Sequence, residues 1–377
     1  MKVCHVTSVH ELNDTRIFEK ECSTLAEAGY ETYLIGNGEN YIKNGVFIKG
    51  VKNCYKGRIG RSLLYSKKLV DEALKLNCDI YHLHDPELLI YGNKIRKKGH
   101  MVIFDSHEDT PRQILDKHWI PLFARKLISY LYEKYEKKIC RRIDAVVVAT
   151  EKIGDVFNSY GINATVIFNY PIENHMISSA IEKKSKNLLC FAGSLFIGNG
   201  IIQLIDVVYD LPNVRLKLAG PIQDEVKKHL ELKKNDRIQY LGILSHQDVA
   251  KLYMESTIGV VADLPTGNNI DGLPIKMFEY MQFGLPILTT NFPLRKKIFE
   301  EYKCGVLIDP YNHLEYKKAV QSILLDEEFR KKCEFNGKIA VKNRYNWKSE
   351  ANKLVCLYSE LEKDSQKKRV VERMFEQ

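Results

Sequence analysis

The sequence predicts an α/β protein of two domains, each built on a parallel sheet with helices on both faces. At 377 residues the chain is too long for one ordinary core and long enough for two. Short apolar runs alternate with helical patterns until about residue 310, as in sheets whose strands are joined by helices. The alternation stops at one polar segment and then restarts. This repeat predicts two similar domains facing each other across a cleft, with ligands beyond the carboxyl ends of the strands.

The expected strands form two groups, one on either side of that polar segment. Each is a short apolar run bounded by turn or polar residues. Between the first two strands, Asn13 or Asp14 can cap a helix that Gly29 ends. We expect strands at Val3–Thr7, Glu31–Ile35, Val46–Val51, Asp79–Leu83, Met101–Asp105, Ala145–Ala149 and Thr165–Phe168, and then at Leu188–Ala192, Arg215–Ala219, Ile238–Leu241, Ile258–Ala262, Pro286–Thr289 and Gly305–Ile308.

The same patterns give the domain boundaries. We expect an N-terminal, acceptor-side domain at residues 1–172 and a linker at 173–187, where the chain is polar and rich in lysine. A C-terminal domain then covers residues 188–345. From Leu314 onward the pattern is helical only, and we expect residues 346–377 to form helices that return to the N-terminal domain.

The composition is that of a soluble globular protein, with 45% hydrophobic and 28% charged residues. No stretch approaches the ~20 apolar residues of a membrane-spanning helix, and the first residues run directly into a strand pattern rather than a signal peptide. Nine cysteines without a CxxC pair fit a reducing compartment. We therefore expect a cytoplasmic protein, and its net charge of +9 indicates anionic partners.

The segment richest in chemistry is DGLPIKMFEYMQFGLPILTT, residues 271–290. Its Gly-Leu-Pro turn should open a helix at Pro274, because proline in the first helical position costs no hydrogen bond. The start of a helix presents free N–H groups and a partial positive charge, to which Lys276 adds a cation. Asp271 before the turn and Glu279 on the helix supply two carboxylates for hydroxyl groups. The plain alternative is an ordinary capped helix followed by a strand.

This segment resembles the donor-binding signature of the retaining glycosyltransferases of family 4, which have the GT-B fold. The match consists of Asp271-Gly272-Leu273-Pro274, Glu279-Tyr280-Met281 and Gly284-Leu285-Pro286. The resemblance extends over nearly the whole chain through Phe191–Leu195, Leu216–Gly220, Ile238–Leu244, Val249–Tyr253, Asn13–Lys20, His84–Glu87 and Asp105–Glu108.

The resemblance implies a GT-B enzyme with two Rossmann-like domains facing across a cleft and a C-terminal helical segment. Such an enzyme moves a hexose-type unit from a UDP- or GDP-sugar to a hydroxyl of a glycan or lipid-linked glycan, in polysaccharide biosynthesis. The stereochemistry is retaining, and neither a metal nor another cofactor is expected. Catalysis then depends on electrostatic stabilisation of the leaving diphosphate and of an oxocarbenium-like sugar.

The resemblance also assigns roles to residues. His107 lies beside the reacting carbon of the sugar, Asp271 contacts the sugar, and Glu279 holds the ribose. The remaining donor-binding positions are the glycine loop at Gly193 and Ser194 and the helix start at Leu273, Pro274, Ile275 and Lys276.

Two departures concern the diphosphate. Where the family usually has an arginine after the loop glycine and a lysine shortly after, this chain has Ser194 and Asn199. Positive charge must then come from Lys276, from helix N-termini, or from Arg16 and Lys20 across the cleft.

Two short segments, His84-Asp85 and His107-Glu108-Asp109, have side chains that could hold a metal. Each segment follows a different strand with no third nitrogen or thiolate ligand in register, so we expect no metal. His82 alternates with His84 along a strand, and one of the two is expected to face the core.

Residues 112–142 carry nine Lys and Arg against three Asp and Glu. One interpretation is that their apolar stripe, at Trp119, Ile120, Phe123, Leu127, Tyr130 and Leu131, packs on the sheet beneath solvated lysines. The other is a basic amphipathic surface in peripheral contact with the inner face of the membrane, where a lipid-linked acceptor would lie. We expect no nucleic-acid partner, since no binding module is recognisable.

Two other functions fit the same fold. A sugar-nucleotide 2-epimerase would use carboxylates and histidines as acid and base, although the turn at residues 271–274 argues against it. A non-catalytic binding subunit is the second alternative, which the missing diphosphate cations keep open. The sequence leaves the sugar, the base and the acceptor undefined.

Overall fold

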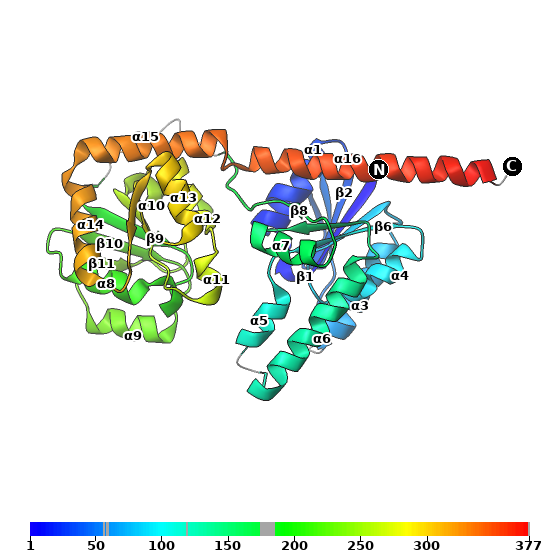
Figure 1. Ribbon diagram of the computed structural model, residues 1–377, viewed down its shortest axis with the longest axis horizontal. Coiled ribbons are helices and arrows are strands. Elements are labelled where there is room, and N and C mark those ends of the chain that lie inside the picture. Colours follow the sequence, from blue (N-terminus) through cyan, green and yellow to red (C-terminus); the bar gives the residue numbers. More distant parts are fainter. Residues whose placement is uncertain (56, 58–59, 118–119, 174–184, 376–377) are drawn as a thin grey trace. The chain divides into compact units, whose positions relative to one another are not determined.

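The computed structural model describes residues 1–55, 57, 60–117, 120–173 and 185–375. The chain folds into two units (Figure 1). Unit 1 consists of Met1–Asn169 and Trp347–Gln377, and unit 2 consists of Tyr170–Asn346. Most of the expected linker, residues 174–184, lies outside the described residues.

Unit 1 contains an eight-stranded sheet in the order β3-β4-β2-β1-β5-β6-β7-β8. All neighbours are parallel except the edge pair of β3 and β4, and β3 is the strand that the sequence analysis missed. The strands are β1 Lys2–Glu11, β2 Glu31–Asn37, β3 Tyr41–Lys43, β4 Val46–Gly50, β5 Ile80–Leu83, β6 Met101–Ser106, β7 Ala145–Val148 and β8 Thr165–Val166.

Helices cover both faces of this sheet. On one face they bury Val6, Leu83 and Phe104 in the larger core, and on the other face Val3, Ile80 and Ile103 meet α1 and α16. The helices are η1 Thr15–Cys22, α1 Ser23–Glu27, η2 Gly60–Tyr65, α3 Ser66–Leu74, η3 Leu89–Tyr91, α4 Gly92–Arg96, α5 Thr110–Asp116, α6 Leu122–Cys140, α7 Glu151–Ser159 and α16 Trp347–Phe375.

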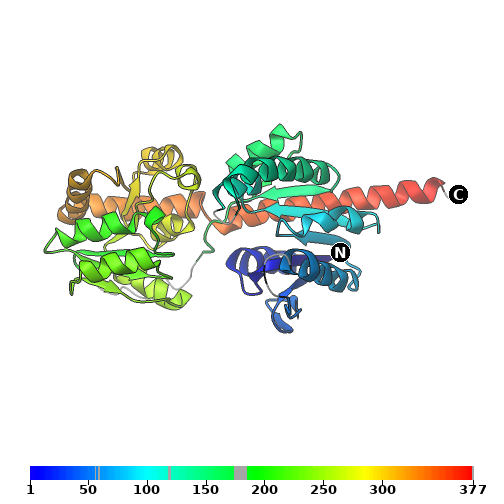
Figure 2. The ribbon, with the colours of Figure 1, turned by 90° about the horizontal axis from the view of Figure 1, so that it is seen from below.

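Helix α16 is part of unit 1 although unit 2 separates it from the rest of that unit in the sequence. It runs along the unit (Figure 2), and its Leu354 and Tyr358 are fully buried in the second core. Trp347 Nε1 donates a hydrogen bond to Thr24 Oγ1 at 2.9 Å. The Glu350 carboxylate accepts one from the Phe168 amide at 2.9 Å. Apolar burial and two polar contacts therefore fix this helix.

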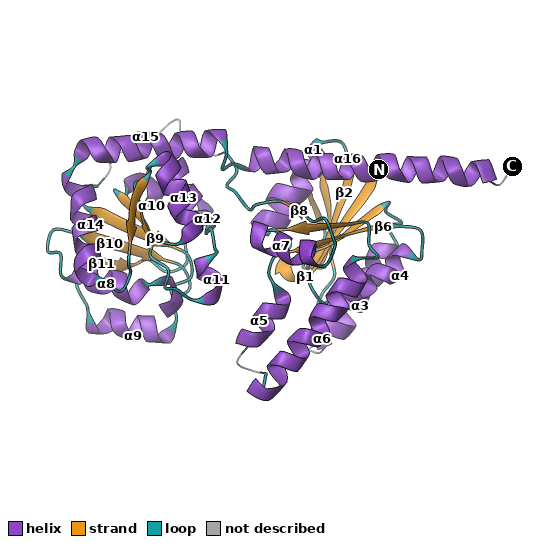
Figure 3. Cartoon of the chain, in the orientation of Figure 1, coloured by secondary structure: helices purple, strands orange, loops and turns teal. Residues whose placement is uncertain are grey.

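Unit 2 contains a six-stranded parallel sheet in the order β11-β10-β9-β12-β13-β14, between two helical layers (Figure 3). This is the doubly wound strand order of dinucleotide-binding domains. The strands are β9 Leu188–Ala192, β10 Arg215–Ala219, β11 Ile238–Tyr240, β12 Ile258–Val261, β13 Ile287–Thr290 and β14 Gly305–Ile308. The helices are η5 Ile197–Asn199, α8 Ile201–Tyr209, α9 Asp224–Leu232, α10 His246–Glu255, α11 Gly267–Ile270, α12 Ile275–Gln282, α13 Pro293–Tyr302, α14 His313–Leu325 and α15 Glu327–Asn343.

The helix after β1 differs from the expected α-helix because its first part, η1, is a π-helix. The Asp14 side chain caps it by accepting hydrogen bonds from the amides of Arg16 and Ile17. The wider turn directs Arg16, Lys20 and Glu21 inward, where all three are buried. π-Helical turns are rare and occur frequently at functional sites.

The basic segment at residues 112–142 forms α5 and α6, which project from the sheet of unit 1 (Figure 1). The interpretation that its whole apolar stripe packs on the sheet is wrong. Ile120 is buried, but Phe123 is 89% exposed and Leu127 60% exposed. Tyr130 and Leu131 are exposed as well. Trp119 lies outside the described residues. The cause is geometric, because the first part of α6 extends beyond the sheet.

The role of α16 in unit 1 leads to a stability prediction. Leu354→Ala should lower the free energy of unfolding by about 2–5 kcal/mol, because it opens a cavity in a filled core. Leu232→Ala, at a side chain 83% exposed, should change it by less than about 0.5 kcal/mol. Urea denaturation followed by circular dichroism measures both. Equal effects of the two substitutions would show that α16 does not complete the core.

Candidate active site

At the carboxyl edge of the unit 2 sheet, a glycine loop meets Lys276 of α12. Gly193 follows β9 with φ +139°, and a Cβ there would lie 2.6 Å from Lys276 Nζ. Gly220 follows β10, and a Cβ there would lie 2.1 Å from the Gly193 carbonyl oxygen. Lys276 Nζ also lies 3.8 Å from the centre of the Phe191 ring. The absence of side chains at the two glycines thus lets this ammonium group lie directly against the loop.

Helix α12 carries the two charged side chains among the predicted donor-binding residues, Lys276 and Glu279. It begins at Ile275, one residue later than expected, because Pro274 is extended, with ψ 135°, and stands at the N-cap. Glu279 is half-buried, and one of its carboxylate oxygens accepts a hydrogen bond from the Tyr253 hydroxyl at 3.0 Å. Asp271 ends the short helix α11, just before the Gly-Leu-Pro turn. Leu273, Pro274 and Ile275 are partly buried.

Arg295, a buried residue on α13, contacts the Gly-Leu-Pro turn that precedes α12. This residue was not among those predicted from the sequence. Its guanidinium pairs with Asp263 at 2.5 Å and donates to the Gly272 carbonyl at 3.3 Å. It also donates to Thr289 Oγ1 at 3.0 Å. Arg295 therefore joins the turn before α12 to the ends of β12 and β13. No local sequence pattern predicts these contacts of Arg295, because Asp263, Gly272 and Thr289 come from separate segments of the chain.

The two positions that lack the family's cations contact each other. Asn199 Nδ2 donates a hydrogen bond to the Ser194 carbonyl at 2.7 Å, which closes the glycine loop on itself. Ser194 is exposed. Asn199 thus has a structural role within the loop, where a lysine would supply charge.

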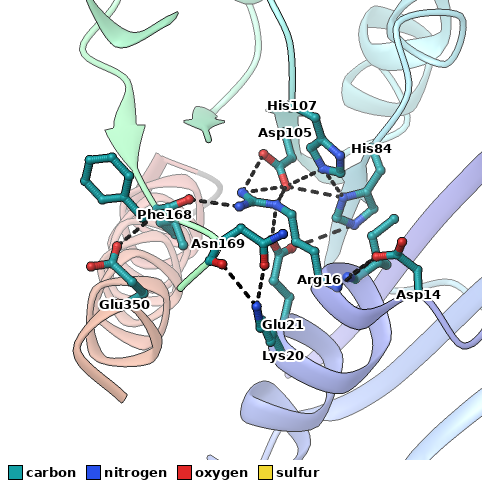
Figure 4. A network of polar contacts seen from close by, with 12 residues as sticks. Asp14, Arg16, Lys20, Glu21, His84, Asp105, His107, Phe168, Asn169 and Glu350 are labelled. Atoms are coloured by element: carbon teal, nitrogen blue, oxygen red, sulfur yellow. Dashed lines mark hydrogen bonds and ion pairs between the residues drawn. The ribbon is translucent and has the colours of Figure 1, made fainter. Parts of the chain in front are cut away.

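At the carboxyl edge of the unit 1 sheet, His107 follows β6 and Nε2 of its ring lies 2.9 Å from Asp105 Oδ2 (Figure 4). Arg16 of η1 contacts both oxygens of Asp105, at 3.1 and 3.2 Å, and contacts Glu21 at 3.1 Å. The Lys20 ammonium donates to the backbone and side-chain oxygens of Asn169. The two predicted cleft cations are therefore buried and already paired within unit 1, so their contacts do not support a role toward a diphosphate.

Three more histidines lie beneath His107, on one face of the sheet. His5 is paired in register with His82, and His84 is two residues farther on. His5 Nδ1 lies 2.8 Å from His84 Nε2, and both His82 and His84 are buried. One of the latter two was expected to face the core, and both do, because residues two apart on a strand share a face.

The reason given for expecting no metal is also wrong. His5, Glu21, His82 and His84 offer ligand atoms within 4.8 Å of one another, and so do His84, Asp105 and His107. The strands bring third and fourth ligand-type groups into register. The imidazole nitrogens of His5 and His84, however, already face each other at hydrogen-bond distance. Independence from metal stays a prediction.

Burial and one ion pair set the charges at this edge. Burial lowers the pKa of His5 and His82 well below the ordinary range. Burial also lowers the pKa of His84, and this effect outweighs the opposing attraction of the Asp105 carboxylate. Burial opposes ionisation of Asp105, but Arg16 and then His107 hold the pKa of that carboxyl well below its usual value. Burial raises the pKa of Glu21 well above its usual value. The edge therefore holds neutral imidazoles around one carboxylate.

In unit 2, burial lowers the pKa of Lys276 to about 8, partly offset by the attraction of Asp263 and Glu279. Its ammonium is thus poorly solvated and gains from contact with an anion.

Two Rossmann-like units with these sites define a glycosyltransferase of the GT-B class. Residues 16–170 match the family described as Glycosyltransferase Family 4, and residues 173–340 match Glycosyl transferases group 1. The chain belongs to glycosyltransferase family 4.

Two curated relatives give the range of similarity. An uncharacterized glycosyltransferase of Methanocaldococcus jannaschii is 23% identical over 63% of this chain and 64% of its own length. The chitobiosyldiphosphodolichol beta-mannosyltransferase of Kluyveromyces lactis is 26% identical over 51% of this chain and 42% of its own length. The matches therefore span about two fifths to two thirds of these relatives.

Solved structures share the fold over almost the whole chain. Sucrose-phosphate synthase from Thermosynechococcus elongatus has a TM-score of 0.73 at 15% identity, covering 96% of this chain and 98% of its own. Anabaena HepE, in complex with UDP and glucose, has a TM-score of 0.72 at 13% identity, covering 96% and 100%. None of the described helices combines the length and apolarity needed to cross a membrane.

The anchoring role of Arg295 can be tested by stability. Arg295→Met should destabilise the protein by about 3–5 kcal/mol, because it leaves Asp263 buried and charged without its partner. Adding Asp263→Asn should recover part of that loss, since the unpaired charge is then gone. Denaturation by urea measures the single and double variants. A double variant less stable than Arg295→Met would contradict the proposed cause.

Proposed function

We propose that this protein transfers a hexose-type sugar, with retention, from a UDP- or GDP-sugar to a hydroxyl of a glycan or lipid-linked glycan in polysaccharide biosynthesis. The reaction is proposed to need no metal or other cofactor. The donor binds at the carboxyl edge of the unit 2 sheet, with the ribose on Glu279 and the sugar near Asp271. His107 of unit 1 is the proposed catalytic residue on the sugar.

The observation that carries this proposal is the position of Lys276. Its ammonium lies against the glycine loop, on the same helix as Glu279 and one residue after the helix begins. A diphosphate at this loop would meet a cation and the first amides of α12 together. Lys276 can thus replace the charges that Ser194 and Asn199 do not supply.

The names of related proteins support the substrate classes. The Anabaena structure contains UDP and glucose, and a trehalose-6-phosphate structure from Escherichia coli contains UDP-2-fluoro glucose. The Kluyveromyces relative is named for a mannosyl transfer that involves a dolichol diphosphate. These names favour a uridine nucleotide and a lipid-linked acceptor.

Incubation with a nucleotide-sugar, with and without an acceptor, distinguishes the proposal from its two rivals. A 2-epimerase converts the donor without an acceptor, and a non-catalytic subunit leaves the donor unchanged with any acceptor. A transferase releases the nucleotide in proportion to the acceptor added.

The pKa of Lys276 predicts how donor affinity depends on pH. An anion favours the charged lysine, so affinity should be constant well below pH 8 and be about tenfold lower than that plateau at about pH 9. Lys276→Met should bind weakly at every pH. Glu279→Gln, the matched control on the same helix, should bind about 1.5–3 kcal/mol more weakly and keep the pH dependence. Calorimetry with UDP-sugars measures all three. A wild-type affinity that is flat through this range would remove Lys276 from the site.

For His107, the predicted effect is on turnover rather than on donor binding. His107→Ala should lower kcat by about 100-fold or more while changing donor affinity little, because this side chain contacts the reacting sugar and not the nucleotide. Initial rates and calorimetry on the same preparation separate the two. Equal losses of kcat and affinity would indicate a structural histidine.

Helix α6 supports the proposal of peripheral contact with the inner face of the membrane. Phe123, Leu127 and Tyr130 are exposed and follow one another at helical spacing. The same spacing continues through Lys134, Lys138 and Arg141, so one exposed face is apolar at its start and basic at its end. Five cations line a cavity of about 450 Å³ at the basic end: Lys134, Lys137, Lys138, Arg141 and Arg142. Apolar insertion beside cationic contacts is the pattern of peripheral binding to anionic lipid.

Vesicle binding tests this surface. The protein should sediment with anionic vesicles but not with neutral ones, and less so at high salt, because salt screens exposed charges. Reversal of Lys134, Lys137 and Lys138 should nearly abolish binding, since each cation contributes about 1 kcal/mol at such a surface.

The matched control reverses Lys227, Lys228 and Lys234, which are exposed on and just after α9. It should bind as the wild type does. Equal losses in the two triple variants would show that net charge, and not α6, governs binding.

A further inference from the structure

A continuous row of buried polar side chains connects helix α16 to Asp105, the partner of His107. The row begins at His82, whose Nδ1 lies 2.8 Å from the hydroxyl of Tyr358. That hydroxyl lies 3.3 Å from His5 Nε2. The row continues from His5 Nδ1 to His84 Nε2 at 2.8 Å. His84 Nδ1 then faces two groups, Asp105 Oδ2 at 3.4 Å and His107 Nε2 at 3.5 Å.

Strand register and packing hold this row in place. His5 and His82 are directly paired on β1 and β5, and the rings of His82 and His84 stack with centroids 4.6 Å apart. Tyr358 is fully buried, and its ring is nearly parallel to that of His5, at 6.5 Å. A hydroxyl from the last helix is thus built into the row of histidines on the sheet.

The carboxylate at one end and the Tyr358 hydroxyl within the row together set the direction of the hydrogen bonds. Asp105 is ionised because Arg16 offsets the cost of its burial, so it can only accept. His84 Nδ1 must then carry the proton, and its Nε2 accepts from His5 Nδ1. His5 Nε2 accepts in turn from the Tyr358 hydroxyl, whose oxygen accepts from His82 Nδ1.

The opposite direction is physically worse. It would place the lone pair of His84 Nδ1 against the Asp105 carboxylate. It would also put a hydrogen on His82 Nε2, a buried atom with no hydrogen-bond partner among the described residues. An orphaned buried N–H is rarer in proteins than an unused acceptor.

We propose that Tyr358 is a positioning residue for His107, because its hydroxyl lies between His82 and His5 and holds His5 and His84 in the tautomers that place a donor against Asp105. With His84 donating to Asp105, the Nε2–H of His107 donates to the same oxygen. The hydrogen bond to Asp105 thereby fixes the orientation of the His107 imidazole. The effect on catalysis rests on the proposed function, whereas the tautomers do not.

Nitrogen NMR of the full chain labelled in its histidines tests the tautomers directly. His5, His82 and His84 should be neutral with the proton on Nδ1, and His107 should carry it on Nε2. In Tyr358→Phe, which keeps the ring and removes the hydroxyl, His5 and His82 should lose this single tautomer. Tyr316→Phe is the matched control, since the Tyr316 hydroxyl is buried in unit 2 without a partner among the described residues. It should leave all four signals unchanged.

Kinetics on the same variants give the second readout. Tyr358→Phe should lower kcat about fivefold to tenfold with the KM for the donor unchanged, as the loss of one neutral hydrogen bond allows. Tyr316→Phe should match the wild type.

Three results would overturn the proposal. The first is a wild-type protein in which His5 or His84 carries its proton on Nε2 or is charged. The second is Tyr358→Phe with wild-type tautomers. The third is one tightly bound Zn²⁺ per chain by elemental analysis, because a metal would use the nitrogens that the row requires. If no transferase activity is found while the tautomers agree, only the proposed function fails.

Discussion

The buried ion pair between Arg16 and Asp105 is the interaction on which the functional edge of unit 1 depends. It joins the π-helix after β1 to the end of β6, and Arg16 also donates to the Ile167 carbonyl at 2.9 Å. Breaking such a pair by removing one partner typically costs about 3–5 kcal/mol. Without Arg16, Asp105 would tend to take up a proton, and the imidazoles beside it would lose their ionised acceptor. Charge and position at this edge therefore have one common cause.

The site of unit 2 depends instead on two positions without side chains, Gly193 and Gly220. These two glycines bring the loops after β9 and β10 together, and the space left open at Gly193 is where Lys276 lies. The positive charge thus comes from the helix that also carries Glu279, and not from the loop itself. Because burial has already lowered the pKa of Lys276, an anion placed near this lysine raises that pKa and favours its charged form. Buried Arg295 keeps the preceding turn in place.

The sequence was sufficient for the features that local pattern controls. Among the residues that the structure describes, the apolar runs located thirteen of the fourteen strands, and the missed strand β3 is a three-residue edge with every side chain exposed. Long-range pairing was not predictable in the same way. Nothing near Tyr358 indicates that it meets His5 and His82, because the contact depends on where α16 packs. The exposed stripe of α6 was ambiguous, since a helical apolar pattern does not say what covers it.

The position of α16 also has a consequence for synthesis of the chain on the ribosome. The face of the unit 1 sheet that carries Val3, Ile80 and Ile103 is covered by Leu354 and Tyr358, more than two hundred residues later. Unit 2 is continuous and can fold while the remainder is still being made. Until α16 has been synthesised, one apolar face of the unit 1 sheet stays exposed. Exposed apolar surface of this kind favours aggregation and chaperone binding. The N-terminal half of this protein is therefore the half that finishes folding last.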